Sequence, residues 1–264
     1  SFFASAFLTT YWLDDRIRFY LDIYYRNMDD NYWGIGVDNG FNVEKGVETT
    51  AYHLNAYRVN PTLLIRITNN FYAGVKGNFN KTTATDLSDL MKEDQHILLF
   101  GTDIYNAGLG LTLNYDTRDF PPNPSKGFLI KLEGLAYNKV FGGDNNYKII
   151  DFDYRQYLQV IRDGSVLAWQ IKARIGVEQV PWTDMSTIGS LYDLRGYYNG
   201  QFRDRSASFI LLEYRHKFFR VRSVEPSRHG MVFWIGGGTV YSTPQEIKKL
   251  LPGVGLGYRY ELQP

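Results

Sequence analysis

Histidines and a glycine run are the residues of this chain whose types could support catalysis, metal binding or phosphate binding. The four histidines, His53, His96, His216 and His229, have no metal-ligand spacing. The run at 236–239 reads GGGT and lacks the Lys-Ser or Lys-Thr ending of a phosphate-binding loop, and the chain contains no Gly-x-Ser-x-Gly nucleophile motif. We therefore expect no catalytic residue, no metal ion and no cofactor, and a protein that is not an enzyme.

An arginine in a long connection is the next residue whose surroundings suggest a role. Arg195 is flanked by Asp193 and Gly196 and lies in the segment 180–205, the longest connection of the chain. Connections of this length are uncommon unless they are functional or folded onto another part of the protein. Taken alone, a loop Arg-Gly pair is solvated more often than docked, so the residues leave both interpretations open.

A third candidate is a polar segment that precedes a proline-rich turn. It reads Tyr115-Asp116-Thr117-Arg118-Asp119 and is followed by prolines at 121, 122 and 124 and by Lys126-Gly127. Asp116 and Arg118 fall on the polar face at the end of a predicted strand, and prolines suit a turn where no ladder donor is needed. The segment is predicted to shape and end a turn, although an ordinary surface ion pair explains the residues equally well.

The elements that must position these residues are strands, because apolar and polar residues alternate with a period of two. From Arg16 to Arg26 the odd-numbered residues are apolar or aromatic and most even-numbered residues are charged or polar. The same alternation runs through 107–118 and 165–178. About eleven strands are predicted, at 2–12, 16–26, 47–59, 70–80, 107–118, 126–139, 147–161, 165–178, 206–219, 230–241 and 253–262.

The lengths of these strands favour a membrane barrel over a soluble sheet. Many approach the roughly 9 to 11 residues that a tilted membrane strand requires, against about 5 to 6 in soluble proteins. No stretch approaches the roughly 20 consecutive apolar residues of a transmembrane helix. The chain is 22% charged with a mean hydropathy of −0.32, so its apolar residues are interleaved with polar ones, and its net charge of +1 argues against a nucleic-acid partner.

The connections between the predicted strands alternate between short and long. Short turns are expected at Asp14-Asp15, Asn60-Pro61, 120–125 and Asp163-Gly164, and long loops at 27–46, 81–102 and 180–205. The connections 220–229 and 242–252 fit this alternation less well, because they are similar in length. Outer-membrane barrels keep short turns on the periplasmic side, so we expect an integral protein of the bacterial outer membrane with its long loops extracellular.

The charged face of these strands must line the interior if the chain spans a membrane. Each of Arg16, Arg18 and Arg26 would cost roughly 2 to 4 kcal/mol if it faced lipid near the bilayer midplane. A soluble ligand-binding β-barrel is the alternative, because alternation alone also describes an antiparallel sheet with one wet face. The fold class predicted is all-β, an antiparallel transmembrane β-barrel of the outer-membrane type.

Three motifs in order along the chain resemble the BamA and TamA superfamily of bacterial surface antigens. The segment 115–127 is similar to a signature turn of that superfamily, and Leu194-Arg195-Gly196-Tyr197 is similar to a motif in its long sixth extracellular loop. The segments 233–240 (FWIGGGTV) and 253–258 (GVGLGY) are similar to the strands that follow this loop.

The resemblance implies a docked loop and a periplasmic turn. The loop would tuck into the lumen, where Arg195 contacts an acidic residue on the inner wall through a charge-assisted pair. The family usually carries that acid two positions before the glycine that corresponds to Gly238, but this chain has glycine there. Glu213 and Glu178 are the candidate substitutes, and Asp116 is a more distant one. Asp116, Thr117, Arg118, Asp119 and Gly127 would form the periplasmic turn.

The resemblance also implies a function and partners. We expect a single barrel domain at 1–264 that belongs to a barrel of 12–16 strands. Because family barrels have sixteen strands, we expect this chain to lack terminal strands. We expect no POTRA domain in this chain. The expected function is the insertion, assembly or translocation of proteins, or of lipids, at the outer membrane. Its partners would be outer-membrane lipids, unfolded or secreted client proteins and other outer-membrane assembly components. The alternative is a passive or plugged channel, or a structural barrel.

Overall fold

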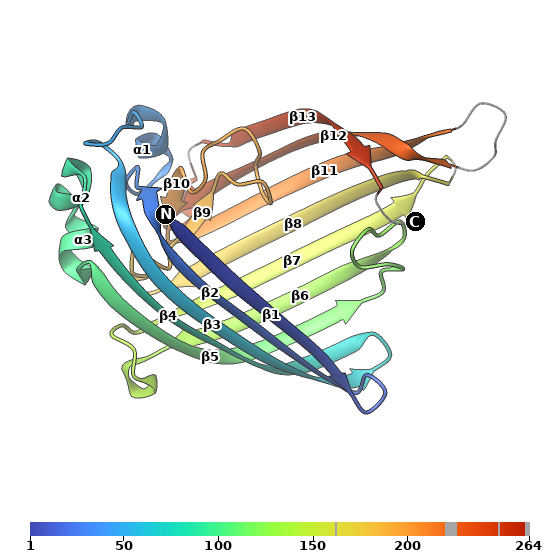
Figure 1. The fold of residues 1–264 in the computed structure, drawn as a ribbon, viewed down its shortest axis with the longest axis horizontal. Helices are drawn as coiled ribbons and strands as arrows, with labels where there is room; N and C mark the ends of the chain where they lie inside the picture. The colour runs from blue at the N-terminus through green and yellow to red at the C-terminus, as the bar shows by residue number, and fades with distance from the viewer. Residues whose placement is uncertain (162, 220–225, 248, 262–264) are drawn as a thin grey trace.

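The protein is built around one large antiparallel sheet, seen in a computed structural model that describes residues 1–161, 163–219, 226–247 and 249–261 (Figure 1). Eleven strands follow one another in the order β1-β2-β3-β4-β5-β6-β7-β8-β11-β12-β13. Their bounds are β1 Phe2–Trp12, β2 Ile17–Asn31, β3 Ala51–Thr68, β4 Phe71–Thr85, β5 Asp103–Asp116, β6 Gly127–Tyr137, β7 Tyr147–Gln159, β8 Ser165–Val177, β11 Ser206–Phe219, β12 Pro226–Tyr241 and β13 Leu251–Tyr260.

The sheet curves into a partial barrel, and β1 and β13 are its two edges (Figure 1). Each strand pairs with its neighbour in an antiparallel register, as in β1 with β2 and β12 with β13. The predicted all-β antiparallel barrel sheet with about eleven strands is therefore confirmed. Among the described residues, no helix is long and apolar enough to cross a membrane.

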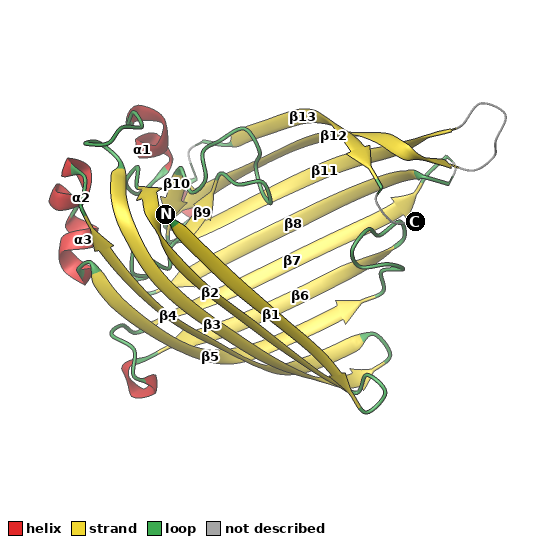
Figure 2. Ribbon diagram, viewed as in Figure 1, coloured by secondary structure: helices red, strands yellow, loops and turns green. Residues whose placement is uncertain are grey.

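The two ends of the strands differ (Figure 2). One end carries a short hairpin, β9 Ser186–Ile188 with β10 Phe202–Asp204, and the helical segments. These segments are α1 Val37–Asn42, α2 Asp89–Glu93, α3 Gln95–Phe100, and the 3₁₀ turns η1 Lys139–Phe141 and η2 Pro244–Glu246. The other end carries short turns between β1 and β2, β3 and β4, β5 and β6, and β7 and β8. The predicted alternation of short and long connections is present, although 220–225, within the connection 220–229, lies outside the described residues.

The turn predicted at Asn60-Pro61 is wrong. β3 runs through both residues, Pro61 is paired with Leu21 of β2, and the turn to β4 falls at 69–70, where Asn70 has a φ of 65°. In the pairing of β3 with β4, Val59 is paired with Phe79 and the next pair is Thr62 with Lys76. Pro61 is therefore not paired with β4. A proline lacks the N–H that such a ladder needs, and here the strand continues because its other neighbour holds it in register.

The two faces of the sheet differ in polarity as the alternation predicts. On β5, Leu111 is 67% exposed on the outer face, whereas its neighbour Thr112 is 1% exposed and lines the lumen. On β8, Ile171 and Ile175 are exposed on the outer face, and Lys172 and Arg174 line the lumen. The apolar face is the one that lipid would contact, and the charged face lines the interior.

Candidate functional site: a loop folded onto the inner wall

The connection between β8 and β11 folds back onto the inner wall of the sheet. Its hairpin, β9 with β10, places Ile188, Leu194 and Phe202 in one buried cluster. The partners of these side chains in the wall are Phe209 of β11, Val240 of β12 and Leu251 of β13, together with Ala207. Leu194 and Phe202 are fully buried, so apolar packing alone gives this loop a fixed position.

The loop also contacts α1, which lies on the side of the loop that faces away from the sheet. The main-chain amide of Gly36, just before α1, donates to the carbonyl of Arg203 at 2.7 Å, and Gln201 donates to the carbonyl of Gly40 at 2.8 Å. The ring of Phe41 lies 5.0 Å from that of Phe202. The loop is therefore enclosed between the helix and the sheet.

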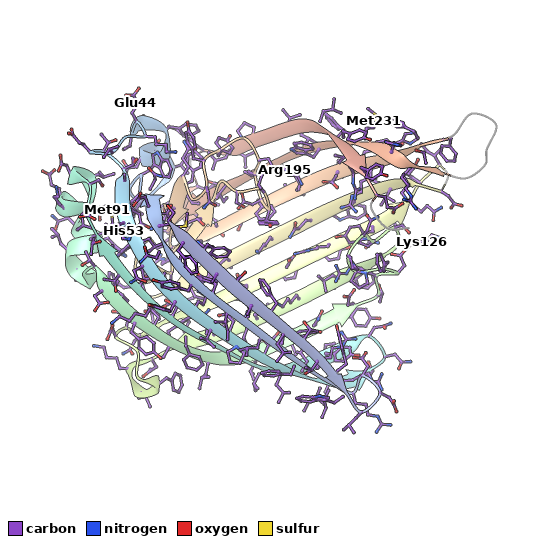
Figure 3. The ribbon with its side chains drawn as sticks, in the orientation of Figure 1. Glu44, His53, Met91, Lys126, Arg195 and Met231 are labelled. Atoms are coloured by element: carbon purple, nitrogen blue, oxygen red, sulfur yellow. The ribbon has the colours of Figure 1, made fainter. Side chains whose placement is uncertain are left out.

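Arg195 reaches the inner wall from the tip of the loop (Figure 3). Its guanidinium carbon lies 4.4 Å from the ring centre of Trp234 on β12, and its Nη2 lies 3.7 Å from Oε2 of Glu213 on β11. Its Nε donates to the carbonyl of Leu191 at 3.2 Å within the loop. Glu213 also accepts a hydrogen bond from Arg215, so one carboxylate serves two arginines. Three contacts therefore position Arg195: the ring of Trp234, the carboxylate of Glu213 and the main-chain oxygen of Leu191.

The structure places only one of the three candidate acids beside Arg195, and that acid is Glu213. Glu178 pairs with Lys148 at 3.0 Å in an exposed position, and Asp116 pairs with Arg118 at 2.7 Å in the turn at the other end of the strands. At Gly236, the position of the family's usual acid, an added Cβ would lie 2.5 Å from the carbonyl oxygen of Ile210. The backbone leaves no room for a side chain there, so the acid must come from another strand.

Tyr197 and Gly196 complete the loop motif against β13. The hydroxyl of Tyr197 donates to the carbonyl of Pro252 at 2.7 Å, and burial raises the pKa of this tyrosine. Gly196 has a φ of 109°, which disfavours any residue with a Cβ. An added Cβ at Gly253 would lie 3.6 Å from both the carbonyl oxygen of Arg195 and a methyl of Leu194. The four residues Leu194 to Tyr197 therefore contact β11, β12 and β13.

Exchanging Arg195 for alanine is expected to loosen the loop tip while leaving the barrel folded. A partly exposed cation–π contact and an ion pair at 3.7 Å are together worth about 1 kcal/mol, which corresponds to roughly a fivefold rise in local opening. Hydrogen exchange of the Gly200 amide, which donates to Gly189 at 2.8 Å, measures that opening. Arg16→Ala, which removes an exposed arginine from the turn between β1 and β2 at the other end of the strands, is the control. Unchanged exchange in Arg195→Ala would contradict the docked role.

A buried aspartate forms a second anchor that the sequence motifs do not reveal. Asp184 is 3% exposed, and its carboxylate accepts hydrogen bonds from the hydroxyl of Tyr147 and from Asn80 Nδ2 at 3.2 Å. Nη2 of Arg58 lies 3.4 Å from the same carboxylate, and Arg174 donates to the main-chain oxygen of Asp184 at 3.2 Å. These partners belong to β7, β4, β3 and β8, so this residue joins the loop to the wall opposite Arg195.

The turn motif forms a compact polar structure at the end with short turns. Arg118 donates to both carboxylate oxygens of Asp116, at 2.8 and 2.7 Å. Partial burial of Asp119 opposes ionisation, but hydrogen bonds from the side chain and amide of Ser125 and from the amides of Lys126 and Phe120 lower its pKa to about 2. Thr117 and Phe128 bond each other across the turn. Gly127 has a φ of 92°, and an added Cβ would lie 2.2 Å from the carbonyl oxygen of Thr117.

The histidines of the chain lie apart from one another. His53 contacts Asp29 at 2.9 Å, His96 contacts the carbonyl of Val180 at 2.9 Å, and His216 contacts Ser165 at 2.9 Å, while His229 bonds Tyr258. Within the described ranges, no three His, Cys, Asp or Glu residues gather in a way that could hold a metal ion.

These features define an antiparallel β-barrel of the outer-membrane type whose long loop folds onto its inner wall. The chain belongs to the Omp85 superfamily, whose domain model matches residues 1–260. No curated protein matches the chain.

Two solved structures share the fold. BamA from Haemophilus ducreyi lacking POTRA domains 1-3 superposes with a TM-score of 0.67 at 13% identity, over 98% of this chain and 56% of that one. CdiB from Acinetobacter baumannii superposes with a TM-score of 0.60 at 14% identity, over 98% of this chain and 43% of that one. The chain thus spans about half the length of these two structures.

Proposed function

We propose that the chain is the membrane barrel of an outer-membrane machine that inserts, assembles or translocates proteins. The observation that carries the proposal is the loop motif 194–197 seated on the inner wall, in a chain that matches the Omp85 superfamily domain over residues 1–260. The superposed structures support the barrel fold, and the role in protein traffic is inferred from family membership.

In this proposal the end that carries the helices and the long loops faces the outside of the cell. Bacterial outer-membrane barrels have short turns on the periplasmic side, so the turn motif at 116–127 is assigned to the periplasm. The exposed apolar outer face is assigned to outer-membrane lipids. Unfolded or secreted proteins are the clients, other outer-membrane assembly components are partners, and the barrel acts without catalytic residues or a cofactor.

A plugged channel is the second candidate, because the lumen is not filled. Two cavities of about 540 and 600 Å³ lie along its polar face, the first of them lined by residues of the inward loop. In this alternative the loop blocks a passage that opens when the loop leaves. Lipid movement through the same barrel would be a third use of its lumen.

Reconstitution of the purified protein into liposomes separates these functions. Under the proposal, the liposomes accelerate the folding of an added unfolded outer-membrane barrel protein. The folding is measured by the change in that protein's gel migration on heating. Arg195→Ala should reduce that acceleration, because the loop tip is loosened, and Arg16→Ala, in the exposed turn between β1 and β2, provides the control. Ion conductance without any acceleration would reject the insertase and favour the channel.

A further inference from the structure

The proline-rich turn between β5 and β6, residues 117–126, is covered by another part of the chain. It contains prolines at 121, 122 and 124, and Pro124 is buried although the turn joins two neighbouring strands. A proline ring restricts the main chain to few conformations, so three prolines within four residues make a stiff segment. A stiff turn can keep its shape while it rests on a distant part of the wall.

The residues that the turn contacts belong to β11 and to the end of β13. The side-chain amide of Asn123 donates to Glu261 at 3.2 Å, and its oxygen accepts from Arg259 at 3.0 Å. Arg215 of β11 donates to the main-chain oxygen of Pro124 at 3.5 Å. Because β7 and β8 lie between β6 and β11 in the sheet, the turn reaches past the ends of two strands. We call the turn 117–126 the strap.

The side chains that hold the strap face the lumen. In β11 they alternate with Leu212, which is exposed on the outer face, and in β13 Arg259 alternates with the exposed Tyr258. Glu261 also accepts a hydrogen bond from Lys217 of β11 at 2.6 Å, so the carboxylate that holds the strap is itself tied to the wall. The strap therefore lies on the lumenal side of the sheet at the end with short turns.

One carboxylate of the wall connects the strap to the inward loop. Oε1 of Glu213 accepts from Nε of Arg215, and Oε2 lies 3.7 Å from Nη2 of Arg195. The same Arg215 donates through Nη1 to Pro124. A guanidinium group is planar, so a hydrogen bond at Nε restricts where Nη1 points. Glu213 therefore orients the arginine that holds the strap, while its other oxygen faces the loop.

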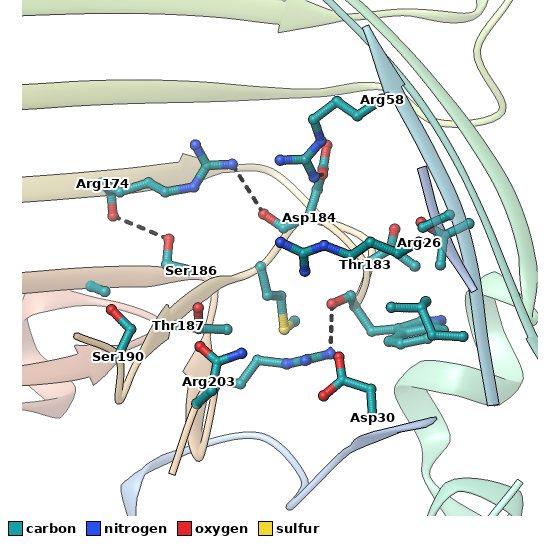
Figure 4. Close-up of a pocket in the computed structure, with 18 of the residues that line it drawn as sticks. Arg26, Asp30, Arg58, Arg174, Thr183, Asp184, Ser186, Thr187, Ser190 and Arg203 are labelled. Atoms are coloured by element: carbon teal, nitrogen blue, oxygen red, sulfur yellow. Dashed lines mark hydrogen bonds and ion pairs between the residues drawn. The ribbon is translucent and has the colours of Figure 1, made fainter. Parts of the chain in front are cut away.

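The inward loop has a base and a tip that different residues hold. Figure 4 shows Arg58 and Arg174 beside Asp184 at the base, where Arg58 lies 3.4 Å from the carboxylate. At the tip, the one-third exposed Arg195 faces Glu213. The ionic contact of the tip therefore depends on Glu213, and the base is held independently by Asp184.

We propose that Glu213 is a positioning residue that couples the two ends of the lumen, because it holds the inward loop through Arg195 and the strap through Arg215. Loss of its charge releases Arg195 and removes the bond that orients Arg215, so the loop tip and the strap loosen together. A change at the long-loop end that displaces Glu213 is thereby transmitted to the short-turn end. The coupling does not depend on what the barrel carries.

Thiol labelling of a single cysteine measures the position of the strap, because the chain contains no cysteine. In a Pro124→Cys protein in detergent, the buried thiol should react slowly with a maleimide while the strap is docked. Asn123→Ala in this background removes both side-chain bonds to the end of β13 and should speed labelling about tenfold.

Glu213→Gln in the same background tests the coupling. Among the described residues, the printed partners of Glu213 are Arg195 and Arg215, and neither belongs to the strap. The substitution should nevertheless speed labelling about threefold, and it should also raise hydrogen exchange at the Gly200 amide of the loop about threefold. Unchanged labelling beside faster loop exchange overturns the coupling, and so does a strap that Asn123→Ala does not release.

Three further variants separate the coupling from a general loosening of the barrel. Glu178→Gln, which removes an exposed and paired carboxylate, is the matched control and should change neither reading. Arg195→Ala should raise loop exchange alone, because Arg215 keeps its bond to Glu213, and Arg215→Gln should speed labelling alone. Heat-modified gel migration shows first that each variant is folded. If Glu213→Gln does not fold, Glu213→Asp, which withdraws the carboxylate by one methylene group, is judged by the same two readings.

Discussion

Replacing Asp184 with alanine is expected to destabilise the inward loop by about 3 kcal/mol, more than Arg195→Ala does. The carboxylate is 3% exposed and receives hydrogen bonds from Tyr147 and Asn80, with Arg58 beside it. Its removal leaves the partly buried Arg58 without its counter-charge and the hydroxyl of Tyr147 without its acceptor, while Asn80 keeps its hydrogen bond to Asn78. Such a cost is large compared with that of a partly exposed contact.

Hydrogen exchange and heat-induced gel migration measure the two consequences of Asp184→Ala. Amides of the segment 182–204 should exchange faster, and the folded band should be lost at lower temperature. Asp103→Ala is the matched control, because Asp103 pairs with Lys81 at 3.3 Å where both side chains are more than half exposed. Equal stability of the two variants would show that Asp184 does not anchor the loop.

The contrast with Arg195 shows how the loop is fixed. Arg195 is one-third exposed, and its nearest carboxylate atom is 3.7 Å away, beyond hydrogen-bonding distance. Asp184 holds the same loop through groups on the opposite part of the wall. Loss of Arg195 should free the tip, whereas loss of Asp184 should free the base.

The strands could be predicted because their environment imposes a period of two. In β2 and β8 one face of the sheet meets a wet lumen and the other an apolar phase. The polarity of each residue therefore indicates on which face its side chain lies. At Pro61 this reasoning fails, because a proline signals a turn locally but is tolerated in β3 where the ladder with β4 is interrupted. The short β9 and β10 have three residues each, too few to show any alternation.

The candidate site could be predicted only in part. The motif 194–197 predicts the docked loop. Glu213 could be proposed as the partner of Arg195 because it is an acidic residue on the polar face of the neighbouring strand β11. Asp184 follows a proline and a tryptophan in a loop, where an aspartate suggests only a turn, and indeed its amide donates to Pro181 at 2.9 Å. Its partners, Tyr147 and Asn80, are far away in sequence, and the curvature of the sheet brings them together.

The lumenal wall itself contains a buried charge cluster whose loss should also be costly. Glu133 on β6 is 6% exposed, and its two carboxylate oxygens lie 2.8 Å from Nζ of Lys76 and 3.0 Å from Nζ of Lys131. Glu133→Ala would leave two neighbouring ammonium groups without their counter-charge. We expect the free energy of unfolding to fall by about 3 kcal/mol, measured by urea titration in detergent.

A surface ion pair of the same type gives the matched control for Glu133. Glu178 pairs with Lys148 at 3.0 Å, but about half of each side chain is exposed, so Glu178→Ala should cost less than about 1 kcal/mol. Combining Glu133→Ala with Lys76→Met should cost less than the sum of the single changes, because the stranded charge is then removed. Similar losses for Glu133→Ala and Glu178→Ala would mean that water reaches the cluster and screens it. The lumenal charges would then not hold the sheet together.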